Sequence, residues 1–183
     1  MNIRKPTREE ILAAAGRSVP DLIAKNLLVL FCGINPSLYS AAVGHHFARP
    51  GNRFWPTLHA AGFTNRLLAP HEEQELLRKG YGITNVASRA TATADELARE
   101  ELIEGGRFLL KKVRRYRPRF LAVLGVSAYR SAFARPKART GLQEETIGRT
   151  RIWLLPNPSG LNAHYQLNDL ARLFRELREA AAG

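Results

Sequence analysis

Two short apolar runs, far apart in the sequence, each lead directly into an Asn-Pro turn. Residues 27–32 precede the turn at Asn35-Pro36, and residues 152–155 precede the turn at Asn157-Pro158. Continuous apolar runs of this length are typical of strands that are buried on both faces of a parallel sheet. Because open parallel sheets bind ligands beyond the carboxyl ends of their strands, we expect the two turns to build one pocket.

Around these runs, segments with helical and strand-like patterns alternate along the chain. Helices are predicted over residues 11–15, 54–61, 70–79, 95–116, 125–133 and 167–182, and strands over residues 27–32, 81–86, 120–124 and a hairpin at 144–156. This alternation predicts an α/β fold, a three-layer α/β/α sandwich with a short, mostly parallel central sheet. The length of 183 residues suits a single domain.

Residues 33–53 show little periodicity, and we expect a long functional loop there. Phe47 could stack on a flat ligand, and Arg49 and Arg53 add positive charge beside it. The adjacent histidines His45 and His46 would need further ligands to hold a metal. Because the sequence offers no matching His or Cys spacing, we predict no metal and no cofactor.

The charge of the chain points to a polyanionic partner. The sequence holds 28 Lys and Arg against 16 Asp and Glu, a formal net charge of +12. Nucleic acid is the simplest partner for such a domain. Residues 1–20 are charged, and no apolar run reaches the roughly 18 residues that span a bilayer. We therefore expect a cytoplasmic protein without a membrane partner, and its one cysteine, Cys32, as a small buried hydrophobe.

The first Asn-Pro turn allows two interpretations. The Asn35 side chain cannot ionise, so it could orient a water molecule but would be a poor general base. Alternatively, Asn35-Pro36 is a structural Asx-Pro turn, which is common.

The second turn also allows two interpretations. Pro158 and Gly160 make it rigid and place Leu161 at its tip. Leu161 could fold back onto the core, or it could be a wedge that enters a base stack, as apolar side chains do in DNA-bending proteins. A protein that does chemistry on a base must extrude that base, and a wedge offsets part of the unstacking cost.

Taken together, several motifs resemble those of one enzyme family. They are Phe31-Cys32-Gly33-Ile34-Asn35-Pro36, Phe47-Ala48-Arg49-Pro50, Asn52-Arg53-Phe54-Trp55, residues 122–125 with Tyr129, and Asn157-Pro158-Ser159-Gly160-Leu161. In this order and spacing, the chain resembles the mismatch-specific uracil-DNA glycosylases, relatives of thymine-DNA glycosylase within the uracil-DNA glycosylase superfamily. The resemblance runs from about residue 28 to residue 177 and leaves residues 1–25 as an N-terminal extension.

The resemblance implies a monofunctional DNA glycosylase of base excision repair. It would flip uracil mispaired with guanine out of duplex DNA and hydrolyse the N-glycosidic bond by water attack. Mispaired thymine and damaged pyrimidines are further substrates that the resemblance suggests. It also implies double-stranded DNA as the partner, located in the nucleoid, and a monomeric enzyme.

The resemblance further implies a role for individual residues, matched by position. Asn35 would orient the attacking water. Phe47 would stack on the flipped base, and the backbone around Ile34 and Phe47 would hydrogen-bond the edge of that base. Ser40 would lie near the base, and Asn157 would line the side that carries the sugar and the base O2 atom. Leu161 would be the wedge, and Ser159, Gly160 and Asn162 would contact the DNA around it.

Three positions depart from the family pattern. Ser37 replaces the usual Gly after Asn-Pro and could narrow the pocket. Ala163 replaces a basic or polar residue, and His164 could substitute for it. Asp95 follows the strand at 81–86 and is either a helix N-cap or a second catalytic residue that supplies the carboxylate that Asn35 lacks.

Two other functions remain open from the sequence. A non-catalytic binder of mismatches or abasic sites would keep Phe47 and Leu161 but would not need Asn35. An α/β enzyme of free nucleotides is disfavoured because the chain has no Gly-x-x-x-x-Gly-Lys-Ser/Thr loop and residues 33–38 are poor in glycine.

Overall fold

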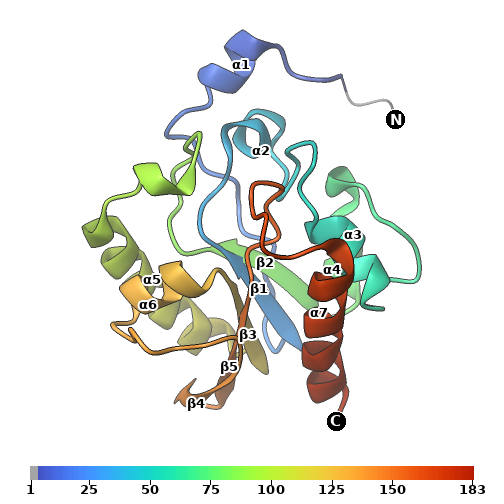
Figure 1. Cartoon of the computed structure of the whole chain (residues 1–183), viewed down its shortest axis with the longest axis vertical. Helices are drawn as coiled ribbons and strands as arrows, with labels where there is room; N and C mark the ends of the chain where they lie inside the picture. Colours follow the sequence, from blue (N-terminus) through green and yellow to red (C-terminus); the bar gives the residue numbers. More distant parts are fainter. Residues whose placement is uncertain (1–3) are drawn as a thin grey trace.

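A five-stranded sheet forms the centre of the computed structural model, which describes residues 4–183 (Figure 1). The strands are β1 (Val29–Gly33), β2 (Tyr81–Asn85), β3 (Phe120–Leu124), β4 (Gly141–Ile147) and β5 (Thr150–Leu155), in the spatial order β2-β1-β3-β5-β4. Neighbours pair in parallel except for β4, which runs antiparallel to β5 at one edge. The carboxyl ends of four strands therefore meet at one edge of the sheet.

Helices cover both faces of this sheet. They are α1 (Arg8–Leu12), α2 (Leu38–Val43), α3 (Phe54–Ala60), α4 (Gln74–Arg78), α5 (Arg99–Tyr116), α6 (Val126–Ala132) and α7 (Leu167–Ala182), with short 3₁₀ turns η1 (Pro70–Glu72) and η2 (Ala94–Glu96). Figure 1 shows α5 and α6 on one side of the sheet and α3, α4 and α7 on the other. The predicted three-layer α/β/α sandwich with its mostly parallel sheet is confirmed.

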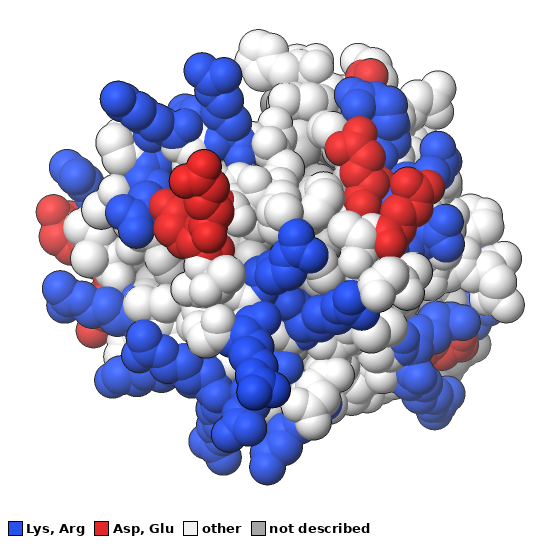
Figure 2. Space-filling model, turned by 90° about the horizontal axis from the view of Figure 1, so that it is seen from below, with Lys and Arg blue, Asp and Glu red and all other residues white. Residues whose placement is uncertain are grey.

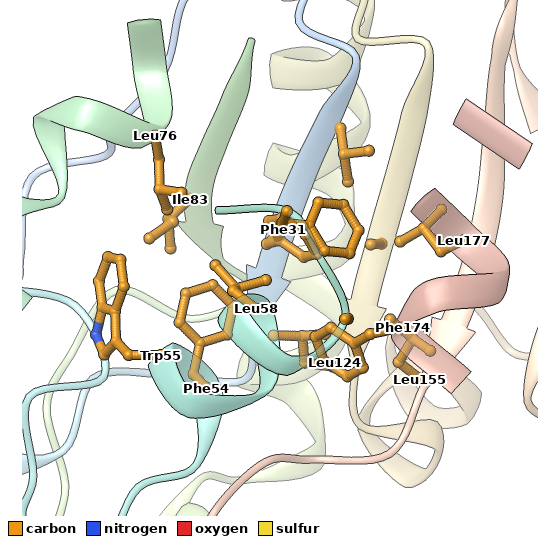
Figure 3. Close-up of a cluster of buried hydrophobic side chains, with 14 of the residues drawn as sticks. Phe31, Phe54, Trp55, Leu58, Leu76, Ile83, Leu124, Leu155, Phe174 and Leu177 are labelled. Atoms are coloured by element: carbon orange, nitrogen blue, oxygen red, sulfur yellow. The ribbon is translucent and has the colours of Figure 1, made fainter. Parts of the chain in front are cut away.

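The buried side chains alternate between these two faces, as strand geometry requires. Phe31 of β1 points towards α3 and α7, where its ring packs edge-on against Phe54 at 5.5 Å between centroids and lies parallel to Phe174 at 6.1 Å (Figure 3). Its neighbours Leu30 and Cys32 point to the other face and pack with α5 and α6. Cys32 is fully buried, as predicted, and burial raises the pKa of its thiol, which keeps it unreactive.

The helix predicted over residues 95–116 begins later, at Arg99. Ala98 is its N-cap residue, and the Glu101 carboxylate accepts a hydrogen bond from the Ala98 N–H at 2.8 Å. Gly105 and Gly106, in the middle of α5, allow the helix to pack closely against neighbouring backbone. A Cβ on Gly105 would overlap the Val86 carbonyl oxygen, and one on Gly106 would lie 2.6 Å from the Ala132 carbonyl oxygen.

The residues before β1 pack against the elements that carry the site. Leu22 pairs with Ile83 of β2 in an antiparallel bridge. Gly16 N–H donates to the Ala90 carbonyl at 3.0 Å, and Ala90 N–H donates to the Arg17 carbonyl at 2.8 Å. The N-terminal segment thus holds the loop that follows β2 in place.

Among residues 4–183, no helix is both long enough and apolar enough to cross a membrane.

Candidate active site

One pocket at the carboxyl edge of the sheet brings the two Asn-Pro turns together. Asn35, at the end of β1, and Asn157, at the end of β5, both line it. The remaining lining comes mainly from the loop before α3 and from residues 91–94, which follow β2. The two turns therefore share a pocket, as their positions after parallel strands predict.

The Asn35 side chain is held in one orientation. Its amide nitrogen Nδ2 donates to the Arg89 carbonyl at 2.9 Å and to Thr91 Oγ1 at 2.7 Å. The Thr91 hydroxyl in turn donates to the Thr93 carbonyl at 2.7 Å. Both amide hydrogens of Asn35 are thereby used, so its Oδ1 atom is the atom left to accept a hydrogen bond from a ligand or a water. This orientation is what a water-positioning residue requires.

Thr91 is a positioning residue that the sequence analysis did not find. We expect Thr91→Val to lower the single-turnover rate of the base excision that the sequence resemblance implies about 5- to 10-fold, equivalent to roughly 1–1.4 kcal/mol, because Asn35 Nδ2 loses an acceptor. DNA affinity should stay within about 2-fold of wild type, as measured by fluorescence anisotropy. Thr91→Ser keeps the hydroxyl and should restore the rate; equal losses in both variants would argue for a packing defect instead.

Phe47 lies against the inner wall of the pocket. Its ring stacks on Phe54 with 4.0 Å between centroids and 24° between planes, and Phe47 itself lines the pocket. The backbone of Phe47 has a φ of 52°, which is unusual for a bulky residue. One ring face is thus supported by a buried aromatic side chain, so the position suits stacking of a planar ligand on the other.

Two serines fix the loop around Phe47. Ser37 is the N-cap of α2, and its hydroxyl accepts from the Ser40 N–H at 3.1 Å. Ser40 Oγ accepts from the Ala48 N–H at 3.0 Å. Ser40 lines the pocket as expected, but its hydroxyl is engaged with the loop, and the side chain of Ser37 serves as a helix cap. Helix α2 itself lies inside the segment predicted to be a loop.

The second turn is a compact Asx turn. Asn157 Oδ1 accepts from the Ser159 N–H at 3.0 Å, and the Asn157 carbonyl accepts from Asn162 Nδ2 at 3.1 Å. The amide nitrogen of Asn157 remains as its donor towards the pocket. Leu161 at the tip is 67% exposed, so it does not fold back onto the core. Of the two interpretations for Leu161, this exposure favours the wedge.

Arg53 binds the Leu161 turn to the rest of the site. Its Nη2 atom donates to the Ser159 carbonyl at 2.7 Å and to the Asn162 carbonyl at 2.9 Å, and its Nη1 atom donates to the Tyr165 carbonyl. The Arg53 N–H also donates to the Pro158 carbonyl at 2.9 Å. The guanidinium is therefore a structural clamp, and the expectation that Arg53 simply adds charge beside the ligand is wrong.

Gly160 allows this turn to approach the preceding loop. A Cβ at Gly160 would lie 2.6 Å from the Gly51 carbonyl oxygen, which is closer than side-chain carbons pack. Glycine is therefore required at this position, next to Leu161, for the two backbones to approach each other.

The histidine pair has a structural role. His45 Nδ1 lies 3.1 Å from Glu73 Oε1, and the His46 N–H donates to Glu73 Oε2 at 3.0 Å. His46 Nε2 lies 2.9 Å from the Pro20 carbonyl oxygen, so its ring nitrogen donates there. Within residues 4–183, no three His, Cys, Asp or Glu side chains are grouped so that they could hold a metal ion.

Burial lowers the pKa of His46, with Glu73 opposing the shift, so the folded protein favours the neutral imidazole more than the unfolded chain does. The unfolded chain then binds the extra proton below a pH of about 6.5. We expect the free energy of unfolding to fall as the pH drops from 7 to 5.5, as measured by urea titration. His46→Gln, which keeps a donor for Pro20, should flatten this dependence; an unchanged slope would show that another group causes it.

Asp95 lies beside the pocket rather than in it. It is exposed, belongs to η2, and lines an adjoining pocket together with Asn157 and Leu161. The N-cap interpretation is wrong, because Thr93 caps η2 and Ala98 caps α5. The expected cap failed because the long helix begins four residues after Asp95.

Asn85 is a further pocket residue that the sequence analysis missed. It ends β2, is half-buried and lines the same pocket as Asn35. A Cβ on Gly33 would lie 2.6 Å from Asn85 Oδ1 and 3.1 Å from the Phe47 ring, so Gly33 makes room for both side chains. A polar residue at the carboxyl end of a parallel strand was the signal that could have identified it.

Comparisons with known proteins agree with this geometry. Residues 20–180 match the profile of the uracil DNA glycosylase superfamily. The fold is also similar to the solution NMR structure of a candidate uracil DNA glycosylase from Methanosarcina acetivorans, with a TM-score of 0.60 and 21% sequence identity over 89% of this chain and 98% of that one. The family match covers the sheet, the pocket and both Asn-Pro turns. The chain therefore belongs to the uracil DNA glycosylase superfamily, whose members are DNA glycosylases that hydrolyse N-glycosyl bonds.

Proposed function

We propose that this DNA glycosylase excises uracil that is mispaired with guanine in duplex DNA, as a monomer and without a cofactor. The observation that carries the proposal is the arrangement of three side chains around one pocket. Asn35 presents Oδ1, Phe47 presents a supported ring face, and Leu161 projects 67% exposed from the rim. In this arrangement Asn35 serves the attacking water, Phe47 serves the flipped base, and Leu161 serves the opened base stack.

In this proposal the flipped uracil stacks on Phe47. The backbone around Ile34 and Phe47 bonds the edge of the base, and Asn157 Nδ2 donates towards the O2 side of the base and the sugar. Uracil leaves as an anion, and donors already fixed in place stabilise that charge without reorganising. The fixed Asx turn at Asn157 supports such a preorganised donor.

The water attacks the sugar after the glycosidic bond has largely broken. The sugar is then oxocarbenium-like, so the water needs little deprotonation and a neutral amide can position it. Asn35 Oδ1 accepts one hydrogen of that water and directs its oxygen to C1′. Because a neutral side chain supplies no charge opposite the cation, we expect a slow chemical step.

Leu161 fills the space that the flipped nucleotide leaves, and the backbone of Gly160 and Asn162 meets the partner guanine. Ser159 lies on the same turn and contacts the DNA backbone. The clamp from Arg53 supports this role, because a wedge must be rigid to hold a base stack open. Guanine contacts from this turn are the proposed source of mismatch preference.

Asp95 contributes a negative charge near the sugar in this proposal. Its pocket adjoins that of Asn35 and shares Asn157 and Leu161 with it. We expect Asp95→Asn to slow single-turnover excision about 10-fold, or roughly 1.4 kcal/mol, with unchanged DNA affinity. Glu96→Gln, in the same 3₁₀ turn, is the matched control. An Asp95→Asn rate within 2-fold of wild type would remove Asp95 from the mechanism.

The proposed substrate is tested with end-labelled duplexes that carry one U·G, U·A or T·G pair and with single-stranded uracil. Each is incubated with excess enzyme and then cleaved with alkali at abasic sites. We expect the fastest excision from U·G. Equal rates on U·G and U·A would contradict the mismatch preference but not the glycosylase activity, and no excision from any uracil substrate would contradict the proposed function.

A further inference from the structure

The face of the molecule opposite the pocket is strongly basic. It lies at the amino ends of the parallel strands, and nine exposed Lys and Arg residues occur at the start of those strands or in the segments that lead into them. We call this the distal basic face; its residues are Lys25, Arg78, Lys79, Arg114, Arg115, Arg117, Arg119, Arg149 and Arg151. Figure 2 shows Lys and Arg side chains across the centre and lower part of this view, with acidic side chains mainly above and beside them.

The segments of this face form one continuous surface. Asn26 N–H donates to the Tyr116 carbonyl at 2.8 Å, and Arg119 N–H donates to the Leu27 carbonyl at 2.7 Å. Arg151 N–H donates to the Arg119 carbonyl at 3.0 Å, which adds the start of β5. The segments before β1, β3 and β5 are thus side by side, so their charges act together.

These charges are not neutralised locally. None of the nine side chains takes part in an ion pair within residues 4–183. Helix dipoles explain Arg78 and Lys79 at the end of α4 and Arg114 and Arg115 at the end of α5. They do not explain Lys25, Arg149 or Arg151, which are on a loop, a hairpin turn and a strand.

The catalytic pocket does not account for the positive charge of the chain. Arg49 is the only Lys or Arg among the residues that line it, within the described part of the chain. The distal basic face, at the opposite edge of the sheet, holds nine of the 28 basic residues. Uracil excision at the pocket therefore gives no reason for this concentration of charge.

We propose that the distal basic face is a second DNA-binding surface, which holds an undamaged duplex segment while the pocket engages another. This inference takes DNA as the partner from the proposed function. Four strand starts about 4.8 Å apart extend over roughly 14 Å, which corresponds to about four base-pair steps of a duplex at ~3.4 Å of helix axis each. An enzyme with two such surfaces transfers between neighbouring duplexes without passing through solution.

Arg117 supports a surface role for this face. It is the C-cap of α5 with a φ of 52°, in the left-handed region where glycine is favoured. The side chain is exposed and makes no hydrogen bond to residues 4–183. Apart from its place at the carboxyl end of α5, which favours a cation, the Arg117 side chain has no hydrogen bond or ion pair within the described residues, and its charge is exposed to solvent.

The test counts duplexes per protein by analytical ultracentrifugation, with excess uracil-free 16-bp duplex at about 50 mM salt. We expect one wild-type protein to bind two duplexes. The triple variant Lys25→Gln, Arg117→Gln, Arg149→Gln removes three charges whose side chains form no ion pair within residues 4–183, and it should bind one. In each single variant, the slope of log affinity against log salt for the second duplex should fall by about 1.

The matched control removes three exposed charges elsewhere, with Arg107→Gln, Lys111→Gln and Lys137→Gln, and should still bind two duplexes. A wild-type protein that binds only one duplex would overturn the proposal, as would a distal triple variant that still binds two. Complexes of two proteins with two duplexes would indicate self-association instead. If the distal basic face binds oligoglutamate in preference to the second duplex, its partner is an acidic protein rather than DNA, which would also overturn the proposal. None of these outcomes depends on uracil excision, which is measured separately.

Discussion

Asn35→Ala is expected to lower the single-turnover rate of uracil excision by about 10²- to 10³-fold. The variant removes the only atom that we assign to the attacking water, Asn35 Oδ1, which the bonds from Nδ2 to Arg89 and Thr91 hold in orientation. DNA affinity should remain, because the Phe47 ring and Leu161 are untouched. Rates are measured with excess enzyme on a U·G duplex, and affinity by anisotropy.

The matched control for Asn35→Ala is Asn168→Ala, since Asn168 is an exposed residue of α7 on the same chain. It should have the rate and affinity of wild type. If Asn35→Ala reduces affinity as strongly as rate, Asn35 binds the substrate rather than positioning water.

Arg53→Met should give the second large effect, because Arg53 donates to three carbonyls of the turn that carries Leu161. Loss of these charged hydrogen bonds is expected to cost about 2–4 kcal/mol of unfolding free energy. The freed turn should also lower the excision rate about 10- to 100-fold, since small displacements at an active site have effects of this size. Urea unfolding and single-turnover kinetics measure the two effects.

Arg53→Lys separates charge from geometry. Lysine keeps the positive charge but cannot reach three carbonyls in a planar fork, so we expect it to resemble Arg53→Met. A lysine variant with wild-type stability and rate would show that the charge alone is sufficient and would contradict the clamp.

The sequence was a good guide to the sheet and to the position of the pocket. Continuous apolar runs identified β1, β3 and β5, and their parallel pairing follows from the helices between them. Because parallel strands end at one edge, the turns at Asn35 and Asn157 were expected to meet, and both line the pocket. These features depend on local pattern and on topology, which a sequence carries directly.

The contacts that orient the site were not predictable in the same way. The Thr91 hydroxyl accepts from the Asn35 side chain 56 residues away, and Arg53 donates to a carbonyl group 112 residues away in the sequence. No local pattern encodes such a contact, since it exists only after the chain has folded. Helix α2 was missed for a related reason: it is only six residues long and is fixed by the cap at Ser37.

The net charge predicted the kind of partner but not which face of the molecule is basic. A charge of +12 predicts a polyanionic partner, yet the pocket lining contains a single arginine, Arg49. Net charge carries no information about which face is basic. Only the folded chain shows that Lys25, Arg117 and Arg149 lie on the face opposite the pocket.

Direct detection of the released base tests the central claim. Wild-type enzyme in excess is incubated with a duplex that contains one U·G pair, and free uracil and the strand are analysed by mass spectrometry. The proposed mechanism predicts one free uracil per duplex and an intact strand with an abasic site, which breaks only after alkali. Tight binding of the U·G duplex without any free uracil would contradict it, and would identify a mismatch-binding protein instead of a glycosylase.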